Sequence, residues 1–470
     1  MKCDSYSCQG ESHIVSGKPC QDWSLHWSDD QSGQYIAIVC DGHGGERYFR
    51  SDQGAKFLCE ITKNALVVFA ESVKECNKTL KIPLFGDRPF TQVSTVLESN
   101  ESVPRHLDED VRVVQLLSSI VTQWREQVEQ HALENPITVW EKEHVRPEYL
   151  VDFEEGRNIE RNYGCTLMAY LQTDIFWLAI HLGDGKCIMF DAQDNCFEPV
   201  LWDEKCFLNR TTSICDPNPV DEFRYSYCGD GSFPVAVFLG SDGIDDSYGD
   251  GEGLHNFYLN ILRMLSSDGA EVVHSELEKS LPIISKKGSK DDMSIAFVYD
   301  DKVLQGHTES LTRKQIERID QELSELKYKA DAKKNTMNEL VGEYERKRAS
   351  LRRGDTGSSE YFGCEKLRIN LKYAFSDYTT FLSQFEYLKK QILQLYSFLG
   401  DAHIKAYALT GNDPDYFTRI KSCIDGSYGK KCDKDEEVET SDYLGDNTNP
   451  IDNGQEKTES DSAPSEVQEE

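Results

Sequence analysis

Hydrophobic residues in the first 300 positions occur mainly in short runs, and helically spaced segments lie between these runs. Short runs rich in Val, Ile, Leu, Phe and Tyr are typical of strands. They predict strands at Tyr35–Cys40, Thr166–Leu171, Phe176–Leu182, Cys187–Asp191, Ala236–Gly240 and Ser294–Tyr299, with a hairpin turn at Asp194–Asn195. The helically spaced segments lie near Arg47–Ser72, Val111–Leu133 and Leu254–Ser266. Strands in hairpins with helices in separate blocks indicate an α+β fold built in layers.

From Leu311 onward, the apolar residues follow a heptad spacing instead. One series is Ile316, Ile319, Leu323, Leu326, Ala330, Met337, Leu340, Tyr344 and Leu351, and the other is Leu371, Phe375, Tyr378, Leu382, Phe385, Leu388, Ile392, Leu395 and Leu399. A polar break at Gly354–Ser359 separates them, which predicts a coiled-coil hairpin of two antiparallel helices. A third helix is predicted at Asp401–Thr410. The apolar stripes of the two helices can pack on each other. Because the second helix has more Phe and Tyr than a two-helix contact requires, a docking face for another protein is the alternative.

These changes of pattern divide the chain into three parts. We expect a mixed domain at 1–302, broken by an insertion of loops at about 75–110, and a helical accessory domain at 305–425. Residues 433–470 are acidic and almost without apolar side chains. Such a segment cannot bury enough surface to order itself, so we predict a disordered tail.

The net charge of −32 is unevenly distributed. Residues 1–300 carry −24, residues 301–432 carry +4 and residues 433–470 carry −12. A surface this negative repels nucleic-acid phosphates and anionic lipids, so we expect neither nucleic acid nor a membrane as a partner. The basic residues within 346–353, at the expected hairpin tip, are either solvated or a site for the acidic tail or another anion.

Cysteine usage and the absence of long apolar runs indicate the compartment. The fifteen cysteines are odd in number and form no C-x-x-C pair, which argues against a zinc ribbon, a thioredoxin motif or a disulfide scaffold. No apolar run approaches the roughly 18 residues that a membrane span requires. Residues Met1–Glu11 also lack the apolar segment of a secretory signal. We therefore expect a cytoplasmic protein with reduced thiols.

Four aspartates lie in glycine-containing segments where the predicted strands begin or end. They are Asp41 in Asp41-Gly-His-Gly-Gly45, Asp184 in Gly183-Asp-Gly185, Asp242 in Ser241-Asp-Gly243 and Asp291 in Gly288-Ser-Lys-Asp-Asp-Met-Ser294. Strand ends hold carboxylates rigidly, and glycines allow an ion to approach closely. Oxygen donors without paired His or Cys suit Mg²⁺ or Mn²⁺ rather than zinc. One Asp-Gly alone is more often only a turn, but four aspartates at strand ends indicate a metal site.

The motifs resemble those of the metal-dependent Ser/Thr protein phosphatases, the PPM or type 2C family. Asp41-Gly-His-Gly-Gly45 looks like the family's signature, and the other segments occur in the family's order. These segments are Cys20-Gln-Asp22, in a form common to a mainly bacterial branch, Gly164-Cys-Thr166, Gly183-Asp-Gly185, Ser241-Asp-Gly-Ile-Asp-Asp246 and Gly288–Ser294. The resemblance covers about residues 1–300. It implies a sandwich of two antiparallel β-sheets flanked by helices, with a binuclear metal centre at one end.

The resemblance also implies the metal ligands. Asp41 would bridge both ions, and the Gly42 carbonyl would ligate one of them. Asp242 and Asp291 would complete the protein ligands of the other ion. The expected cofactor is therefore two Mg²⁺ or Mn²⁺ ions, with a possible third.

The remaining roles that the resemblance implies are less direct. Asp22 would act mostly through water, and Asp184 would help to hold the weaker third ion. His43 would be the general acid that protonates the leaving alkoxide, a role worth about 10²–10⁴-fold in rate. The alternative for His43 is a histidine that only braces the glycine turn.

Two features depart from the family's pattern. The family usually places an arginine a few residues before the N-terminal aspartate, where it binds the substrate phosphate. Here Lys18 occupies that region, with His13 further back, so either of them is a candidate for phosphate binding. The second departure is Asp292 after Asp291, where Asp-Asn is common. Asp292 and Asp246 are expected to be second acids that are only solvated.

The resulting interpretation is metal-dependent hydrolysis of phosphoserine and phosphothreonine on proteins by metal-activated water. The alternative is a weakly active, phosphatase-like scaffold that binds a protein partner through the helical hairpin. Scaffolds of this kind usually lose metal carboxylates, whereas Asp41, Asp242 and Asp291 are all present. Another two-metal hydrolase, such as a nuclease, fits the ions but not the charge of −24 on residues 1–300.

Overall fold

The computed structural model describes residues 1–80, 91–93, 111–200, 202–206, 210–229, 231–248, 251–351, 356–401 and 414–427. Contacts divide the chain into two compact units. The first comprises Met1–Lys334 with Asp377–Thr410, and the second comprises Asn335–Ser376 with Gly411–Glu470. In the described part of the chain, no helix is both long enough and apolar enough to cross a membrane. The predicted acidic tail at 433–470 lies outside the described residues.

Two antiparallel sheets form the centre of the first unit. The first sheet has the order β1 (Lys2–Cys8), β11 (Met293–Tyr299), β10 (Ala236–Gly240), β7 (Lys186–Phe190) and β8 (Cys196–Phe197). The second has the order β2 (Trp23–Asp29), β3 (Gln34–Cys40), β5 (Leu167–Gln172), β6 (Trp177–Leu182), β9 (Arg224–Cys228) and β4 (Thr91–Val93). All six predicted strands are confirmed, and the turn at Asp194–Asn195 joins β7 to β8.

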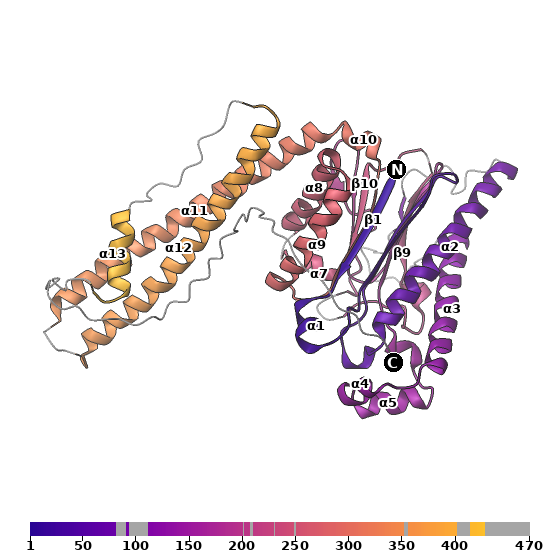
Figure 1. Cartoon of the computed structure of the whole chain (residues 1–470), viewed down its shortest axis with the longest axis horizontal. Helices are drawn as coiled ribbons and strands as arrows, with labels where there is room; N and C mark the ends of the chain where they lie inside the picture. The colour runs from indigo at the N-terminus through magenta and orange to yellow at the C-terminus, as the bar shows by residue number, and fades with distance from the viewer. Residues whose placement is uncertain are drawn as a thin grey trace, which may run out of the picture. The chain divides into compact units, whose positions relative to one another are not determined.

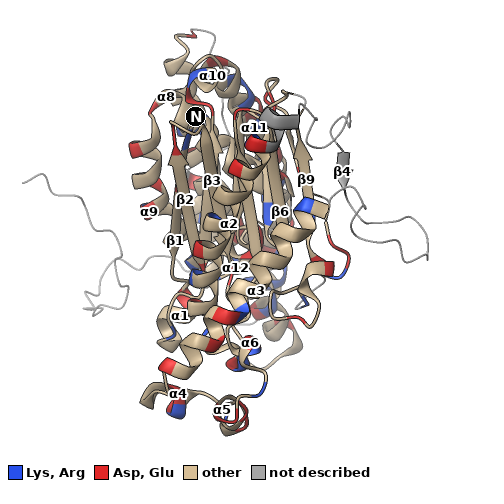
Figure 2. Cartoon of the chain, turned by 90° about the vertical axis from the view of Figure 1, so that its right-hand side faces the viewer, with Lys and Arg blue, Asp and Glu red and all other residues tan. Residues whose placement is uncertain are grey.

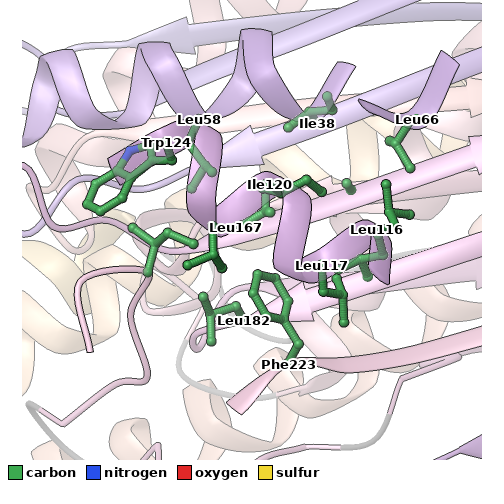
Figure 3. Packing of buried hydrophobic residues seen from close by; sticks show 14 of the residues in the cluster. Ile38, Leu58, Leu66, Leu116, Leu117, Ile120, Trp124, Leu167, Leu182 and Phe223 are labelled. Atoms are coloured by element: carbon green, nitrogen blue, oxygen red, sulfur yellow. The ribbon is translucent and has the colours of Figure 1, made fainter. Parts of the chain in front are cut away.

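Helices cover the outer faces of both sheets, so the first unit has four layers (Figure 1). On the outer face of the second sheet lie α2 (Ser51–Leu80) and α3 (Val111–Glu134), and on that of the first lie α8 (Gly251–Ser267) and α9 (Ala270–Lys287). Figure 3 shows the core under α2 and α3, where Trp124 and Leu58 pack over Leu167 and Leu182. In Figure 2 charged positions lie mainly on helices and loops. Strands β5, β6 and β11 are buried along their whole length. The α+β sandwich flanked by helices is confirmed.

Strands β1 and β2 were not predicted, because their sequences are polar. Ser7 on β1 bonds through its hydroxyl to Ser24 on β2 at 2.8 Å and to Ser294 on β11 at 2.6 Å. Hydroxyl pairs across strands thus replace the apolar alternation that marks a strand in a sequence. Such pairs depend on segments that are distant along the chain.

Short helices fill the loops at the ends of the strands. They are α1 (Glu11–Ser16), η1 (Glu46–Tyr48), α4 (Val139–His144), α5 (Pro147–Glu154), α6 (Ile159–Asn162), η3 (Pro219–Glu222) and α7 (Asp242–Asp245). Arg50 anchors α4 through a buried ion pair with Glu141, whose Nε–Oε1 distance is 2.6 Å. The loop insertion expected at 75–110 begins later than predicted, since α2 continues to Leu80 and β4 lies within the segment. Its other residues lie outside the described part.

The predicted helical hairpin is formed by α11 (Thr308–Ser350) and α12 (Ser359–Phe398), preceded by α10 (Asp301–Gln305). In the first unit, heptad residues of the two helices pack on each other; these are Ile316, Ile319, Leu323, Phe385, Ile392 and Leu395. In the second unit, α13 (Pro414–Ile424) packs Phe417 on Phe375 of α12 with ring centroids 6.0 Å apart. The helix predicted at Asp401–Thr410 lies outside the described residues apart from Asp401. Pro414 begins α13, since proline fits the first helical turn.

The boundary between the catalytic and helical domains near Lys302 stays a prediction. Two buried leucines beyond it can be used to test where the hydrophobic core ends. Leu304 and Leu311 are fully buried in the core that α8 and α9 form with the first sheet. We expect a chain truncated after Lys302 to unfold at a lower urea concentration than one truncated after Lys314. The expected difference is roughly 3–6 kcal/mol, because two buried leucines are removed. Equal urea midpoints for the two chains would place both leucines outside the core.

Candidate active site

The sheet ends bring together the aspartates that the sequence singled out. Asp41 follows β3, Asp184 lies between β6 and β7, Asp242 opens α7 after β10, and Asp291 precedes β11. The carboxyl groups of Asp41 and Asp242 lie close enough to affect each other's pKa. Two buried carboxyls this close repel each other unless one of them holds a proton. The loops thus bring these acidic groups together.

Burial and mutual repulsion raise the pKa values of these acids. Burial and the neighbouring Asp242 carboxylate hold the pKa of Asp41 well above its usual range. Burial, together with other aspartates such as Asp184, raises the pKa of Asp242 to about 7. Burial and the charge of Asp292 likewise raise the pKa of Asp22, which is 3 % exposed. Burial also raises the pKa of Asp184. A cluster of this kind is unfavourable unless protons or cations compensate it.

Parts of the cluster fit a hard divalent cation. The Oδ2 atom of Asp22 is buried and has no hydrogen-bond partner within the described part of the chain. A side chain at position 42 would collide with the Gln21 carbonyl, so glycine allows the backbone after Asp41 to pass close to the segment that carries Asp22. As they stand, no three His, Cys, Asp or Glu side chains of the described residues are arranged to hold a metal ion. The donors are therefore of the type that Mg²⁺ or Mn²⁺ prefers, and water would have to complete the coordination.

His43 is turned toward a neighbouring loop. Its Nε2 atom lies 2.7 Å from the Ser213 hydroxyl, and that hydroxyl donates to the Cys165 carbonyl at 3.1 Å. The ring packs edge-on against Tyr48, with centroids 4.7 Å apart. Burial lowers the pKa of His43 to about 4, so the imidazole is neutral near pH 7. A role as general acid requires His43 to gain a proton when an anionic substrate is present.

Asp292 is not the solvated second acid that we predicted. It is 2 % exposed, and its carboxylate accepts hydrogen bonds from the Gly10 N–H at 2.6 Å and the Gln21 N–H at 2.5 Å. Its Oδ2 atom also lies 2.8 Å from Nδ1 of His13. The bond from His13 and those from the two N–H groups outweigh burial and lower the pKa of Asp292. The prediction was wrong because these partners come from the distant N-terminal segment. Asp246, in contrast, is exposed.

The two candidate phosphate-binding side chains both lie near Gly44 of the glycine loop. The Lys18 ammonium donates to the Gly44 carbonyl at 2.8 Å. The Nε2 atom of His13 lies beside Gly44, and no described residue accepts a hydrogen bond from it. His13 is 7 % exposed, and Asp292 fixes its other ring nitrogen. Lys18 thus braces the loop, while His13 points a nitrogen toward it.

Sequence reasoning missed the loop that follows β8. Three consecutive residues of this loop lie at the site: Thr211 helps to keep the Asp184 carboxyl ionised, Thr212 accepts from the Gly183 N–H at 3.0 Å, and the Ser213 hydroxyl lies 2.7 Å from Nε2 of His43. The segment has no glycine–aspartate motif and no periodicity. A run of hydroxyl residues in a loop was the only available signal, and such runs are common in turns.

The match to a known family decides what kind of site this is. The sequence model of protein phosphatase 2C matches residues 9–282, more than half of the chain. The chain belongs to the protein phosphatase 2C family. It is a protein-serine/threonine phosphatase, and the family is metal-dependent. The resemblance seen in the motifs is thereby confirmed for the catalytic region.

Other comparisons add little to the family assignment. No curated protein sequence matches this phosphatase. A bacterial serine phosphatase of known structure is 14 % identical over 64 % of this chain and 99 % of its own, with a TM-score of 0.35. The phosphatase Stp1 from Staphylococcus aureus is 13 % identical over 64 % of this chain and 95 % of its own, also at 0.35. PppA from Pseudomonas aeruginosa is 14 % identical over 63 % and 96 %, again at 0.35.

Proposed function

We propose that this phosphatase hydrolyses phosphoserine and phosphothreonine on proteins with a binuclear Mg²⁺ or Mn²⁺ centre at the aspartate cluster. The observation that supports it most directly is the contact between the Asp41 and Asp242 carboxyls. A dication held by these carboxylates would take the place of the proton and compensate the repulsion. When bound, two such ions activate water and neutralise phosphoryl oxygens.

The chain's own residues would divide the remaining work. Asp41 would bridge the ions and Gly42 would offer its carbonyl, while Asp242 and Asp291 would hold the other ion. Asp291 is exposed, so its carboxylate is accessible to an ion from solvent. Asp22, with its unpartnered Oδ2 atom, would orient water in the cluster.

Two further groups would act on the substrate or at the periphery. His43 would protonate the alkoxide that leaves, and the Ser213 hydroxyl at its Nε2 atom would orient the ring. Asp184 would hold a weaker third ion, with Thr211 favouring its ionised form.

A turnover assay with a phosphopeptide tests the proposal. We expect the full chain to release phosphate from a phosphothreonine peptide with Mn²⁺ and to lose this activity in EDTA. Calorimetric titration with MnCl₂ in the absence of substrate should show binding. Full activity in EDTA, or no heat of Mn²⁺ binding, would contradict the binuclear centre.

His13 is the stronger candidate for the substrate phosphate, because its free nitrogen lies beside the glycine loop while Lys18 is engaged with Gly44. We expect His13→Ala to raise KM for a phosphopeptide about 10-fold with little change in kcat, since such a contact acts alike in ground and transition states. Lys18→Ala should raise KM only about 2–3-fold, through the loop that it braces. Lys286→Ala, which removes only a surface ion pair with Glu11, serves as the control. A larger KM effect from Lys18→Ala than from His13→Ala would assign the phosphate to Lys18.

One observation favours a second candidate function, the binding of a protein partner by the hairpin. In the second unit, Phe362, Ile369 and Tyr373 of α12 are 63 %, 53 % and 69 % exposed. Their spacing of seven and four residues places them on one face of the helix. Contiguous exposed apolar surface is typical of protein interaction sites. If the protein were a scaffold without turnover, it would release no phosphate from the phosphopeptide and would bind a protein partner through this face.

A further inference from the structure

A buried arginine lies behind the turn that carries Asp184. Arg224, on β9, is 2 % exposed. In the register of β9 against β6, Arg224 lies opposite His181, two residues before Gly183. Its Nη2 atom donates to the Gly183 carbonyl at 2.5 Å. Burying a guanidinium costs free energy unless hydrogen-bond or charge partners compensate it. We therefore expect Arg224 to have a specific role at this turn.

Asp203 accompanies the arginine. This carboxylate is 4 % exposed, and its Oδ2 atom lies 3.8 Å from Nε of Arg224. Its Oδ1 atom accepts from the Lys205 N–H at 3.0 Å, which fixes the carboxylate in its own loop. The guanidinium therefore spans two segments, the loop of Asp203 and the turn of Gly183. An ammonium group lacks the planar fork that reaches two such acceptors.

Other side chains hold the same peptide unit. Gly183 has φ +115°, a conformation that favours glycine, and its N–H donates to the Thr212 hydroxyl at 3.0 Å. The Cys206 thiol donates to the Gly183 carbonyl at 3.5 Å. Both polar groups of Gly183 are thus bonded to buried side chains, immediately before Asp184.

We propose that Arg224 is a positioning residue that sets the direction of the Asp184 carboxylate toward a divalent cation. This inference rests on the proposed metal-dependent function. Arg224 acts through the Gly183 carbonyl and touches neither substrate nor cation. Groups that orient metal ligands typically change metal affinity by about 10–100-fold when they are removed.

Mn²⁺ binding by the full chain tests this role. We expect Arg224→Lys and Thr212→Val each to raise the Mn²⁺ concentration for half-saturation of the weakest site about 10-fold, in calorimetry without substrate. The rise in melting temperature that Mn²⁺ produces should shrink in parallel. Ser226→Ala is the matched control, because Ser226 is fully buried on the same strand and its hydroxyl has no hydrogen-bond partner among the described residues. It should titrate like the unmodified chain.

The outcomes separate this inference from the function on which it rests. If the unmodified chain binds no Mn²⁺, both the proposed function and the positioning role are overturned. If it binds Mn²⁺ and both variants titrate identically to it, only the positioning role is overturned, and Arg224 then serves stability alone. Should Arg224→Lys fail to fold, Thr212→Val decides by the same titration.

Discussion

Replacing Asp41 with alanine is expected to reduce phosphopeptide turnover by at least about 10³-fold, because a bridging ligand of two catalytic ions would be lost. Asp242→Ala and Asp291→Ala should have effects of similar size. The metal-free Asp41→Ala chain should nevertheless unfold at an equal or higher temperature, since one of two carboxyls in contact is removed. Steady-state kinetics at saturating Mn²⁺ and thermal melts in EDTA measure the two effects.

The control for these variants is Asp246→Ala. Asp246 belongs to the same motif as Asp242 but is exposed, and it has no assigned ligand role. Its replacement should leave turnover within about threefold, as expected for a surface residue. Near-normal turnover by Asp41→Ala would refute the metal assignment, and a loss as large in Asp246→Ala would mean that the assay reports general damage to the loop.

The metal-free protein is expected to lose stability as the pH rises from about 4 to about 7. The reason is that the pKa of Asp242 is raised to about 7 by burial and by neighbouring aspartates. The folded chain then holds a proton that the unfolded chain releases near pH 4, so folding is favoured below this range and the advantage disappears above it. Asp22 and Asp41 act in the same direction, since their pKa values are also raised. The expected loss is roughly 2–4 kcal/mol.

Urea unfolding in EDTA between pH 4 and pH 8 measures this loss, and Asp242→Asn should flatten the profile. Asp292 acts with the opposite sign, because its pKa is lowered and its contribution to stability disappears only as the pH falls through that value. Saturating Mn²⁺ should remove the decline, since cations bind the ionised carboxylates. A metal-free stability that increases steadily up to pH 7 would show that the cluster is already compensated by other means.

Local patterns in the sequence determined six of the strands and most of the candidate metal-binding carboxylates. The runs before Asp41 and Asp242 end in Asp-Gly, and both signals lie within a few adjacent residues. Hydrophobic periodicity and turn chemistry act over such short distances, so they can be read without the fold. The same holds for the hairpin, where heptad positions such as Phe385 and Ile392 are buried as predicted.

Tertiary structure alone decided how the site is supported. The partners of Asp292, namely Gly10, His13 and Gln21, lie 282, 279 and 271 residues away in the sequence. Arg224 reaches Gly183 across 41 residues through the pairing of β9 with β6. Whether an acid or an arginine is solvated or buried depends on which distant backbone groups reach it. No local pattern contains that information, because burial and hydrogen bonding arise only when the sheets pack together.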